Sequence, residues 1–355
     1  MSSNARMIPI TQPENATFNS TDWSILARHW YPIARCEDVT DRPVPIQLLD
    51  VKLVIYRTSQ GLSVALDRCP HRGVPLSKGC VKNDHLVCAY HGLNFNAKGT
   101  CTKVPAQPTL VPSERFGLKS LPAIERYGLL WICLAPEDGI SIPAMPTWDE
   151  GDHQNILPPS VDIHGSAGRQ IEGFIDVAHF AFVHHEAFAD PDNPVVPSYE
   201  TTVTDTCIRS DYISTVSNFP KDLNHLEPAG FQWRRIYEIY PPFTARLTVH
   251  FPNDGVLTIL NAACPMTASS TRLFVPITRN FDVTGPLEDV YAFNAQIFAE
   301  DKDIVESQWP QELPLDPLDE AHFAADRSSV AYRRALKRMG LSFSRAVTAS
   351  SLAPA

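Results

Sequence analysis

The sequence contains no long apolar run. No stretch approaches the roughly 20 consecutive apolar residues that a membrane-spanning helix needs, and residues 1–19 have no apolar core of the kind found in signal peptides. The eight cysteines do not follow the spacing of a small secreted scaffold. We therefore expect a protein that has no membrane partner and keeps its thiols reduced in the cytoplasm.

Basic charge is also scarce. The chain has 30 Lys and Arg against 40 Asp and Glu, which gives a formal net charge of -10 at pH 7. Proteins that bind nucleic acids need a basic surface to neutralise phosphates, so we expect no nucleic-acid partner. With 355 residues, of which 44% are hydrophobic and 20% charged, the chain has a globular composition and is long enough for two hydrophobic cores.

Two short loops are rich in side chains that bind metals. The first loop places Cys69 two residues before His71, and the second places Cys88 three residues before His91. Two cysteines and two histidines form the ligand set of a Rieske [2Fe–2S] cluster, in which both Cys bind one iron and both His bind the other. A structural zinc site is the main alternative, but zinc fingers usually pair Cys with Cys and His with His, whereas each loop here is mixed. The pattern therefore favours the cluster.

A second group of candidate ligands lies in the second half of the chain, where Asp176 is followed by His179 and His184. Side chains five residues apart do not share one face of a regular helix, so the helix predicted at 171–185 must kink or end if both imidazoles meet one metal. Asp176, one helical turn before His179, is placed to accept a hydrogen bond from that imidazole. His185 is an alternative ligand, and buried core histidines without a metal would also fit the pattern.

The third ligand of such a site should be an acid. Two His and one carboxylate form the facial triad that leaves coordination positions of Fe(II) open for dioxygen. The candidates lie in a helix predicted at 286–308, and spacing alone does not choose among Glu300, Asp301 and Asp303. An acidic helix face that only meets solvent is the simpler alternative.

With both groups in one chain, the sequence resembles the catalytic, alpha-type component of the Rieske non-haem iron oxygenases over most of residues 23–340. Within that family it is most similar to caffeine N-demethylase-like and saxitoxin-pathway Rieske monooxygenases, through residues 300–310 and 325–333. The resemblance selects Asp301 as the acid ligand. It implies that the cluster is held by Cys69, His71, Cys88 and His91, and that a mononuclear Fe(II) is held by His179, His184 and Asp301.

The resemblance also implies how the two metals cooperate. It implies a homotrimer in which each cluster serves the iron of the neighbouring subunit, with Asp176 bridging between His179 and His91 of the adjacent subunit. The chain contains neither the Cys-x4-Cys-x2-Cys run of a plant-type ferredoxin cluster nor a Gly-x-Gly-x-x-Gly nucleotide loop. We therefore expect electrons from NAD(P)H to arrive through a separate reductase or ferredoxin.

The resemblance implies an oxygenase that acts on a small organic substrate, for example a heterocyclic one. Such an enzyme uses O2 to hydroxylate its substrate or to remove an N- or O-methyl group oxidatively. Two alternatives stay open. One is a Rieske electron-transfer protein whose second domain only binds a ligand, and the other is a cis-dihydroxylating dioxygenase.

Local patterns predict an α+β protein. Alternating apolar residues around the two loops indicate an all-β Rieske domain, and the later part of the chain mixes long strands with helices. The resemblance implies that this second, catalytic domain has the helix-grip, START-like fold, with an antiparallel sheet and covering helices. The expected divisions are a disordered tail at 1–22, a Rieske domain with a lead-in helix at 23–140, a catalytic domain at 141–345 and a flexible tail at 346–355.

Overall fold

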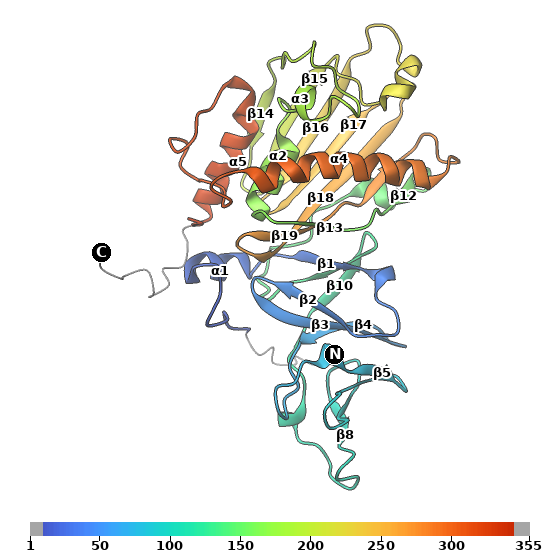
Figure 1. Ribbon diagram of the computed structural model, residues 1–355, viewed down its shortest axis with the longest axis vertical. Helices are drawn as coiled ribbons and strands as arrows, with labels where there is room; N and C mark the ends of the chain where they lie inside the picture. Colours follow the sequence, from blue (N-terminus) through green and yellow to red (C-terminus); the bar gives the residue numbers. More distant parts are fainter. Residues whose placement is uncertain (1–9, 344–355) are drawn as a thin grey trace. The chain divides into compact units, whose positions relative to one another are not determined.

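The structure is a computed structural model that describes residues 10–343. The described chain divides into two compact units, of which the first ends at Ile142 and the second begins at Pro143 (Figure 1). The division falls in a proline-rich stretch of the sequence. The flexible tail expected at 346–355 lies outside the described residues, as do residues 1–9 of the expected N-terminal tail.

The first unit is built from antiparallel sheets of short strands. Its hairpins follow from turn residues that adopt positive φ, such as Leu49 with Asp50 and Asn83 with Asp84. Two consecutive residues of this conformation match the twist of the strands that they connect. Among the described residues this unit has three sheets, ordered β1-β11-β10, β2-β3-β4-β9 and β5-β6-β7-β8.

β3 and β4 pair as an antiparallel hairpin over residues 51–66. The strands are β1 (Tyr31–Arg35), β2 (Val44–Leu48), β3 (Val51–Thr58), β4 (Gly61–Leu66), β5 (Cys80–Lys82), β6 (His85–Val87), β7 (Asn94–Phe95), β8 (Cys101–Lys103), β9 (Ser120–Leu121), β10 (Ala123–Arg126) and β11 (Leu129–Ile132). A short helix, α1 (Ser20–Leu26), precedes them.

Residues 10–22 differ from the disordered tail that we expected there. The Asn19 side chain caps the first turn of α1, and Phe18 is buried. The backbone N–H and the hydroxyl of Thr17 both donate to the Asp50 carboxylate. One buried ring and these capping bonds order a segment whose polar composition had suggested disorder.

The second unit is organised around one large antiparallel sheet. Its strands follow in the order β12-β20-β18-β17-β16-β15-β14, and β19 pairs with both β18 and β13. The central strands are rich in β-branched and aromatic residues, which pack well on a pleated surface. The strands are β12 (Gln154–Ile156), β13 (Val161–Ile163), β14 (Glu200–Val203), β15 (Ile208–Ser214), β16 (Trp233–Tyr240), β17 (Thr244–His250), β18 (Val256–Thr267), β19 (Ser270–Phe274) and β20 (Ile277–Arg279).

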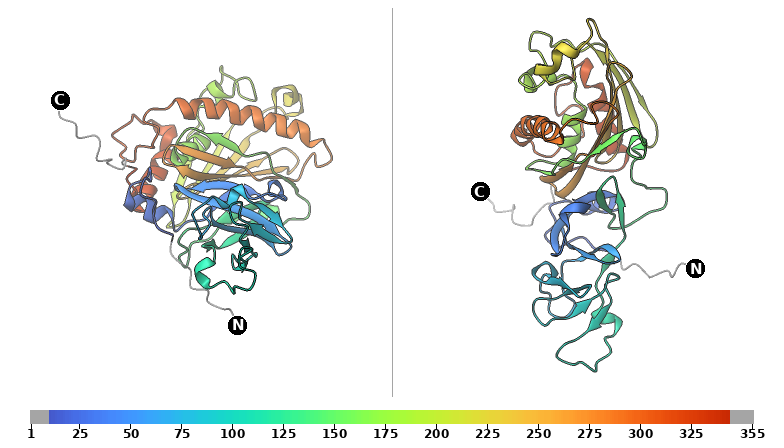
Figure 2. Two further views of the ribbon diagram at one scale, coloured as in Figure 1. Left: turned by 60° about the horizontal axis from the view of Figure 1, so that its bottom comes forward. Right: turned by 90° about the vertical axis from the view of Figure 1, so that its right-hand side faces the viewer.

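Helices cover one face of this sheet (Figure 2). They are α2 (Ala167–Ile175), α3 (Phe180–Val183), α4 (Leu287–Ser307) and α5 (Arg327–Arg338). α2 packs against β17 and β18 and also contacts α4 and α5. A bidentate ion pair between the buried side chains of Arg333 and Glu172 ties α5 to α2. A first unit built from antiparallel sheets, followed in the chain by a second unit with one antiparallel sheet and covering helices, confirms the expected α+β architecture with a helix-grip second domain.

The remaining helical turns are short 3-10 helices. They are η1 (Cys36–Asp38), η2 (Leu76–Lys78), η3 (Glu114–Phe116), η4 (Pro146–Trp148), η5 (Lys221–Leu226) and η6 (Ala324–Asp326). Within the described part of the chain, none of the helices is long and apolar enough to cross a membrane.

Candidate metal centres

The two cysteine–histidine loops have nearly the same backbone. In each loop the N–H of Cys69 or Cys88 donates to the carbonyl oxygen five residues later, at 2.9 Å. The glycine four residues after the cysteine, Gly73 or Gly92, donates back to the cysteine carbonyl and adopts positive φ. Glycine takes that conformation without strain, which explains why each loop contains one.

The loops bring the expected cluster ligands together. The Nδ1 atoms of His71 and His91 lie 3.1 Å apart, and both side chains are exposed. Cys69 and Cys88 are buried, with exposed fractions of 2% and 3%. Burial and the neighbouring Cys88 thiol raise the pKa of Cys69 to about 11, so this side chain ionises at neutral pH only when a cation binds it.

This donor set fits a Rieske [2Fe–2S] cluster. Two imidazole nitrogens bonded to one iron at about 2.1 Å should lie roughly 3 to 3.4 Å apart, as the Nδ1 atoms of His71 and His91 do. The two cysteines belong to one apolar core cluster that also contains Leu86 and Phe95. Buried thiols and exposed imidazoles therefore offer separate positions for two irons.

The second candidate site forms where a helix is interrupted. α2 ends at Ile175, and Asp176 follows in an extended conformation. His179 and His184 then stand at the two ends of the four-residue helix α3, and their Nε2 atoms lie 3.1 Å apart. This is the interruption that the five-residue spacing required.

Asp301 on α4 completes this group. Its Oδ1 atom lies 3.1 Å from Nε2 of His184 and 3.5 Å from Nε2 of His179. Ligands bonded to one metal at about 2.1 Å and roughly at right angles would be about 3 Å apart. The structure therefore brings two imidazoles and one carboxylate into an arrangement that suits a single metal ion.

The electrostatics of the group also suit a cation. Burial by itself lowers the pKa of His179, but Asp176 and Asp301 outweigh that effect and raise the pKa to about 9. Burial would raise the pKa of Asp301, yet hydrogen bonds and charges from His179 and His184 hold it below its usual value. Protons and metal ions compete for the same atoms, so a divalent cation would take the place of the protons that this cluster attracts.

Glu300 holds His184 from the side opposite the metal position. The Nδ1 atom of His184 lies 2.8 Å from Oε2 of Glu300, and Gln296 donates to the other carboxylate oxygen at 2.9 Å. A proton shared between Nδ1 and Glu300 leaves Nε2 as the atom that faces the metal. The ring of Phe188 stacks on His184 with centroids 5.1 Å apart, which restricts the imidazole further.

Asp176 lies beside His179 and is also reachable from solvent. Its Oδ2 atom is 3.7 Å from Nδ1 of His179, a separation typical of an ion pair rather than of a direct hydrogen bond. Its Oδ1 atom accepts the N–H of Ala178 at 2.7 Å. The side chain is 35% exposed, and it lines a polar cavity of about 240 Å³ in the second unit together with Trp309 and His322.

The other candidates from the sequence lie outside the group. His185 is exposed, and its imidazole contacts the Phe182 carbonyl and the Glu186 carboxylate. Asp303 is exposed on α4. Sequence reasoning had weighed Glu300 only as a metal ligand and had missed its contact with His184, because two residues 116 positions apart leave no pattern in a single sequence.

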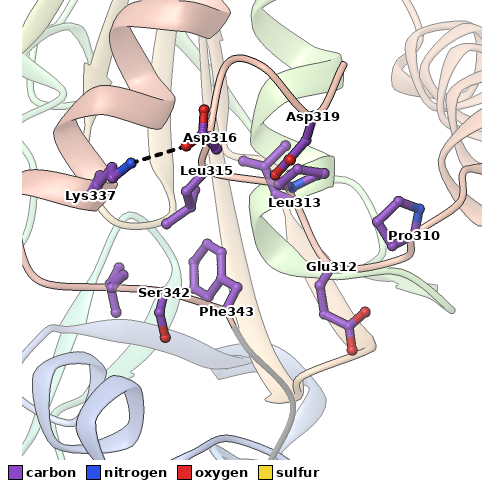
Figure 3. Close-up of a pocket in the computed structure, with 11 residues that line it drawn as sticks. Pro310, Glu312, Leu313, Leu315, Asp316, Asp319, Lys337, Ser342 and Phe343 are labelled. Carbon is purple, nitrogen blue, oxygen red and sulfur yellow. Dashed lines mark ion pairs between the residues drawn. The ribbon is translucent and has the colours of Figure 1, made fainter.

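A larger hollow in the second unit is unrelated to the candidate metal ligands. It has a volume of about 460 Å³ and is lined by Pro310, residues 312–316, Asp319, Lys337 and residues 341–343 (Figure 3). Lys337 pairs with Asp316 across it at 3.6 Å. Its lining contains neither histidine nor cysteine, so it provides no site of the kind formed by His179, His184 and Asp301.

Comparison with known families assigns both halves of the chain. Residues 29–122 match the family described as Rieske [2Fe-2S] domain. Residues 163–342 match the family described as Vanillate O-demethylase oxygenase C-terminal domain. The first match contains both cysteine–histidine loops, and the second contains both histidines and the aspartate of the second site.

Similar proteins extend over most of the chain. The methylxanthine N1-demethylase NdmA of Pseudomonas putida is 28% identical, with 88% of this chain and 89% of the relative covered. The methylxanthine N3-demethylase NdmB of the same organism is 29% identical, with 90% and 91% covered. The solved structure of Pseudomonas putida CBB5 NdmA with caffeine matches at a TM-score of 0.78 and 28% identity, covering 88% of this chain and 91% of that one.

Proposed function

The chain belongs to the Rieske oxygenases that combine a Rieske [2Fe-2S] domain with a vanillate O-demethylase-type catalytic domain, and we propose that it hydroxylates or oxidatively demethylates a small organic molecule. Its cofactors are a Rieske [2Fe–2S] cluster and a mononuclear Fe(II). Similar proteins bear the names methylxanthine N-demethylase, vanillate O-demethylase and dicamba O-demethylase. The single observation that carries the proposal is the convergence of His179, His184 and Asp301 on one point.

The roles of the residues follow from their donor atoms. Thiolates of Cys69 and Cys88 would bind one iron of the cluster, and Nδ1 of His71 and His91 would bind the other. His179, His184 and Asp301 would hold the mononuclear iron. When bound, the cluster supplies electrons one at a time and the Fe(II) activates dioxygen beside the substrate.

Asp176 supports the further proposal that the enzyme works as a homotrimer. Its carboxylate stands between His179 and a solvent-accessible polar cavity, where a histidine of a neighbouring copy can approach it. In a trimer that neighbour would be His91, which is exposed at the end of its loop. Asp176 would then hold both imidazoles and connect the cluster of one subunit to the iron of the next.

The enzyme works with a small-molecule substrate and a separate electron-donor protein, either a reductase or a ferredoxin. We propose NAD(P)H as the ultimate source of electrons and O2 as the co-substrate. We further propose the cytoplasm as its compartment. All eight cysteines are free thiols in the structure, which agrees with a reducing environment.

The first experiment tests the cluster. Purified protein should show the visible absorption and EPR spectrum of a Rieske centre, and Cys69→Ser or Cys88→Ser should each abolish them, because thiolates hold one iron. Cys80→Ser is the matched control, since Cys80 is an exposed thiol outside both loops. A Rieske signal that persists unchanged in Cys69→Ser would refute the assignment.

The second experiment identifies the reaction. The enzyme with a reductase and NADH is given N-methylated heterocycles and O-methylated aromatic acids, and formaldehyde and 18O incorporation are measured. Demethylation predicts one formaldehyde per substrate consumed, while simple hydroxylation predicts a single labelled oxygen in the product. A cis-diol with both oxygens labelled would instead identify a dihydroxylating dioxygenase. Cluster reduction without bound mononuclear iron would identify an electron-transfer protein.

A further inference from the structure

One arginine inside the second unit has no counter-ion. Arg235 on β16 is only 1% exposed, and among the described residues no carboxylate oxygen lies within 4 Å of its guanidinium. The other buried arginines all have carboxylate partners, which are Glu320 for Arg169, Asp282 for Arg279 and Glu172 for Arg333. Burial lowers the pKa of Arg235, and the opposing effect of Glu227 is the smallest of the causes. A buried charge without a partner is costly, so an anion bound here would be stabilised.

The groups that accept hydrogen bonds from Arg235 are all neutral. Its Nε and Nη2 atoms donate to Asn218 Oδ1, and Nη2 also donates to the carbonyl oxygens of Val216 and Ser217. Nη1 donates to Ser214 Oγ at 3.2 Å. Because Nη1 carries two hydrogens, one of them has no acceptor among the described residues. Arg235 therefore anchors the loop that follows β15, but its charge and one of its donors remain unsatisfied.

Tyr237 provides a second unsatisfied donor on the same strand. It lies two positions after Arg235 on β16, so both side chains leave the same face of the sheet, which is the face that the helices cover (Figure 2). Tyr237 is 1% exposed, and its hydroxyl has no hydrogen-bond partner in the described part of the chain. Burial raises the pKa of Tyr237, so the hydroxyl keeps its proton. A buried oxyanion could accept hydrogen bonds from both side chains.

Both donors face the segment that carries the candidate iron ligands. The Cζ atom of Arg235 lies 5.7 Å from the centre of the Phe180 ring, and the centre of that ring lies 5.0 Å from the centre of the His179 imidazole. The ring of Tyr237 lies 6.0 Å from the ring of Phe174, near the end of α2. One phenylalanine ring therefore separates the unpaired guanidinium from an imidazole of the candidate metal site.

We infer that Arg235 and Tyr237 bind the carboxylate of an anionic substrate, an aromatic acid whose oxidised carbon lies at the iron. The inference rests on the proposed function, since it names the substrate class of the same enzyme. The carboxylate would neutralise Arg235 and accept hydrogen bonds from Nη1 and from the Tyr237 hydroxyl. Phe174 and Phe180 would contact the aromatic ring of the acid. A neutral heterocycle would leave the buried cation without a partner, so we expect acids to bind more tightly.

The competing interpretation is that Arg235 only anchors the loop that follows β15. The two interpretations differ in one measurable quantity, the ratio of the affinities for an acid and for its neutral amide. A residue that only anchors the loop supports the binding of both compounds equally. A residue that binds the carboxylate favours the acid, because a hydrogen bond to a charged group is stronger than one to a neutral group.

The test compares acids with amides of the same shape. The probes are para-methoxybenzoate, meta-methoxybenzoate and a methoxynaphthoate, each paired with the corresponding primary amide. Holoenzyme, whose cluster and mononuclear iron have first been quantified, is titrated with each compound by calorimetry. The parent protein should bind at least one of the acids about tenfold or more tightly than its amide.

Substitutions of neighbouring arginines show whether Arg235 causes this preference. Arg235→Gln removes the charge and should reduce the preference for the acid to about twofold or less, whereas Arg235→Lys keeps the charge and should retain part of it. Arg234→Gln is the matched control. Arg234 is the preceding residue of β16, is exposed and pairs with Asp211, so the preference for the acid should not change.

Tyr237→Phe covers the case in which the Arg235 variants do not fold. The Tyr237 hydroxyl has no partner among the described residues, so its removal should leave the melting temperature unchanged or raise it. The affinity for the acid should nevertheless fall by about 3- to 10-fold, because one hydrogen bond to the carboxylate is lost. A residue with a purely structural role would not combine normal stability with weaker binding of the acid.

Three results would overturn the inference. They are a parent protein that binds no acid more tightly than its amide, a preference that survives Arg235→Gln, and, where that variant does not fold, an unchanged affinity for the acid in Tyr237→Phe. Lower stability of Arg235→Gln with an unchanged affinity ratio would show that Arg235 only anchors its loop.

The same measurements keep this inference separate from the proposed function. Turnover of a neutral N-methylated heterocycle by an enzyme that binds none of the acids would leave the oxygenase intact and refute the substrate class. Tight binding of an acid by purified protein that has no mononuclear iron site would support the anion site and refute the proposed function.

Discussion

At the scale of single residues, Asp301 is the carboxylate that we propose as a ligand of the mononuclear iron. Asp301→Ala should lower the content of mononuclear iron and abolish turnover, because it removes the oxygen that lies 3.1 Å from His184 Nε2 and 3.5 Å from His179 Nε2. Metal analysis and cluster EPR measure the two centres separately. The cluster should be unaffected.

Asp303→Ala is the matched control for this prediction. Asp303 lies on the same helix, carries the same charge and is exposed. The Asp303→Ala protein should retain both its mononuclear iron and its activity. The reverse result, with iron kept in Asp301→Ala and lost in Asp303→Ala, would move the ligand by half a helical turn and contradict the geometry of the site.

A second prediction at this scale concerns Glu300, whose role would be to position the imidazole of His184. Glu300→Leu removes the acceptor 2.8 Å from His184 Nδ1, so the imidazole loses its fixed tautomer and orientation. Loss of such a partner costs about 10- to 100-fold in metal affinity. The measurement is iron retained by the protein during dialysis against a graded series of chelator concentrations.

A conservative replacement of Glu300 tests whether this residue positions His184 or only fills space beside it. Glu300→Gln keeps the shape and an acceptor oxygen, so it should restore much of the iron affinity lost in Glu300→Leu. If Glu300→Leu binds iron as tightly as the parent protein, then the contact with His184 has no positioning role.

At the scale of elements, the small sheet that carries the cluster loops depends on Gly79. A Cβ there would lie 2.1 Å from the backbone carbonyl oxygen of Val87 and 3.0 Å from that of Leu76. Backbone atoms cannot move aside as a side-chain end does. Gly79→Ala should therefore separate β5 from β6 and destabilise the first unit by about 1 to 3 kcal/mol.

Denaturant unfolding followed by the cluster absorbance measures this effect. Gly151→Ala is the control, because a Cβ at that position meets nothing within 4 Å. Its unfolding midpoint should be unchanged. A Gly79→Ala protein with normal stability and a normal cluster would show that the sheet is more adaptable than this close contact implies.

At the scale of the whole molecule, Asp176 tests how the two metal centres communicate. Asp176→Asn preserves shape but removes the charge beside His179. Both metals should stay bound and the cluster should still be reduced by an external donor, yet product formation should collapse because the connection to the iron is disturbed. The rate of cluster reduction, measured by stopped flow, should therefore stay normal, while the rate of product formation, measured by chromatography, should fall.

Mixing variants extends this test to the proposed trimer. Cys69→Ser should lack a cluster but keeps Asp176, whereas Asp176→Asn should keep the cluster. In mixed trimers, an intact cluster on one subunit meets an intact Asp176 on its neighbour, so part of the activity should return. Mixed trimers that are proven by mass spectrometry and show no activity would argue that electrons pass within one chain.

The sequence by itself determined which chemistry this protein carries. Cys69 with His71 and Cys88 with His91 lie within short loops, where residue type and local spacing fix the ligand set. The five-residue spacing of His179 and His184 also required a break in the helix, and the structure has one. These features involve residues that lie close together in the chain, so the sequence alone is enough to predict them.

Only the tertiary structure decided which distant side chains meet. Residue spacing did not choose between Asp301 and Asp303, and the family resemblance selected Asp301, which the structure brings to both imidazoles. The structure alone placed Glu300 against the far nitrogen of His184. It also ordered residues 10–22 through Phe18 and Thr17, where polar composition had suggested a tail. These contacts depend on how α4, α3 and the sheets pack, and packing joins residues that a single sequence leaves uncorrelated.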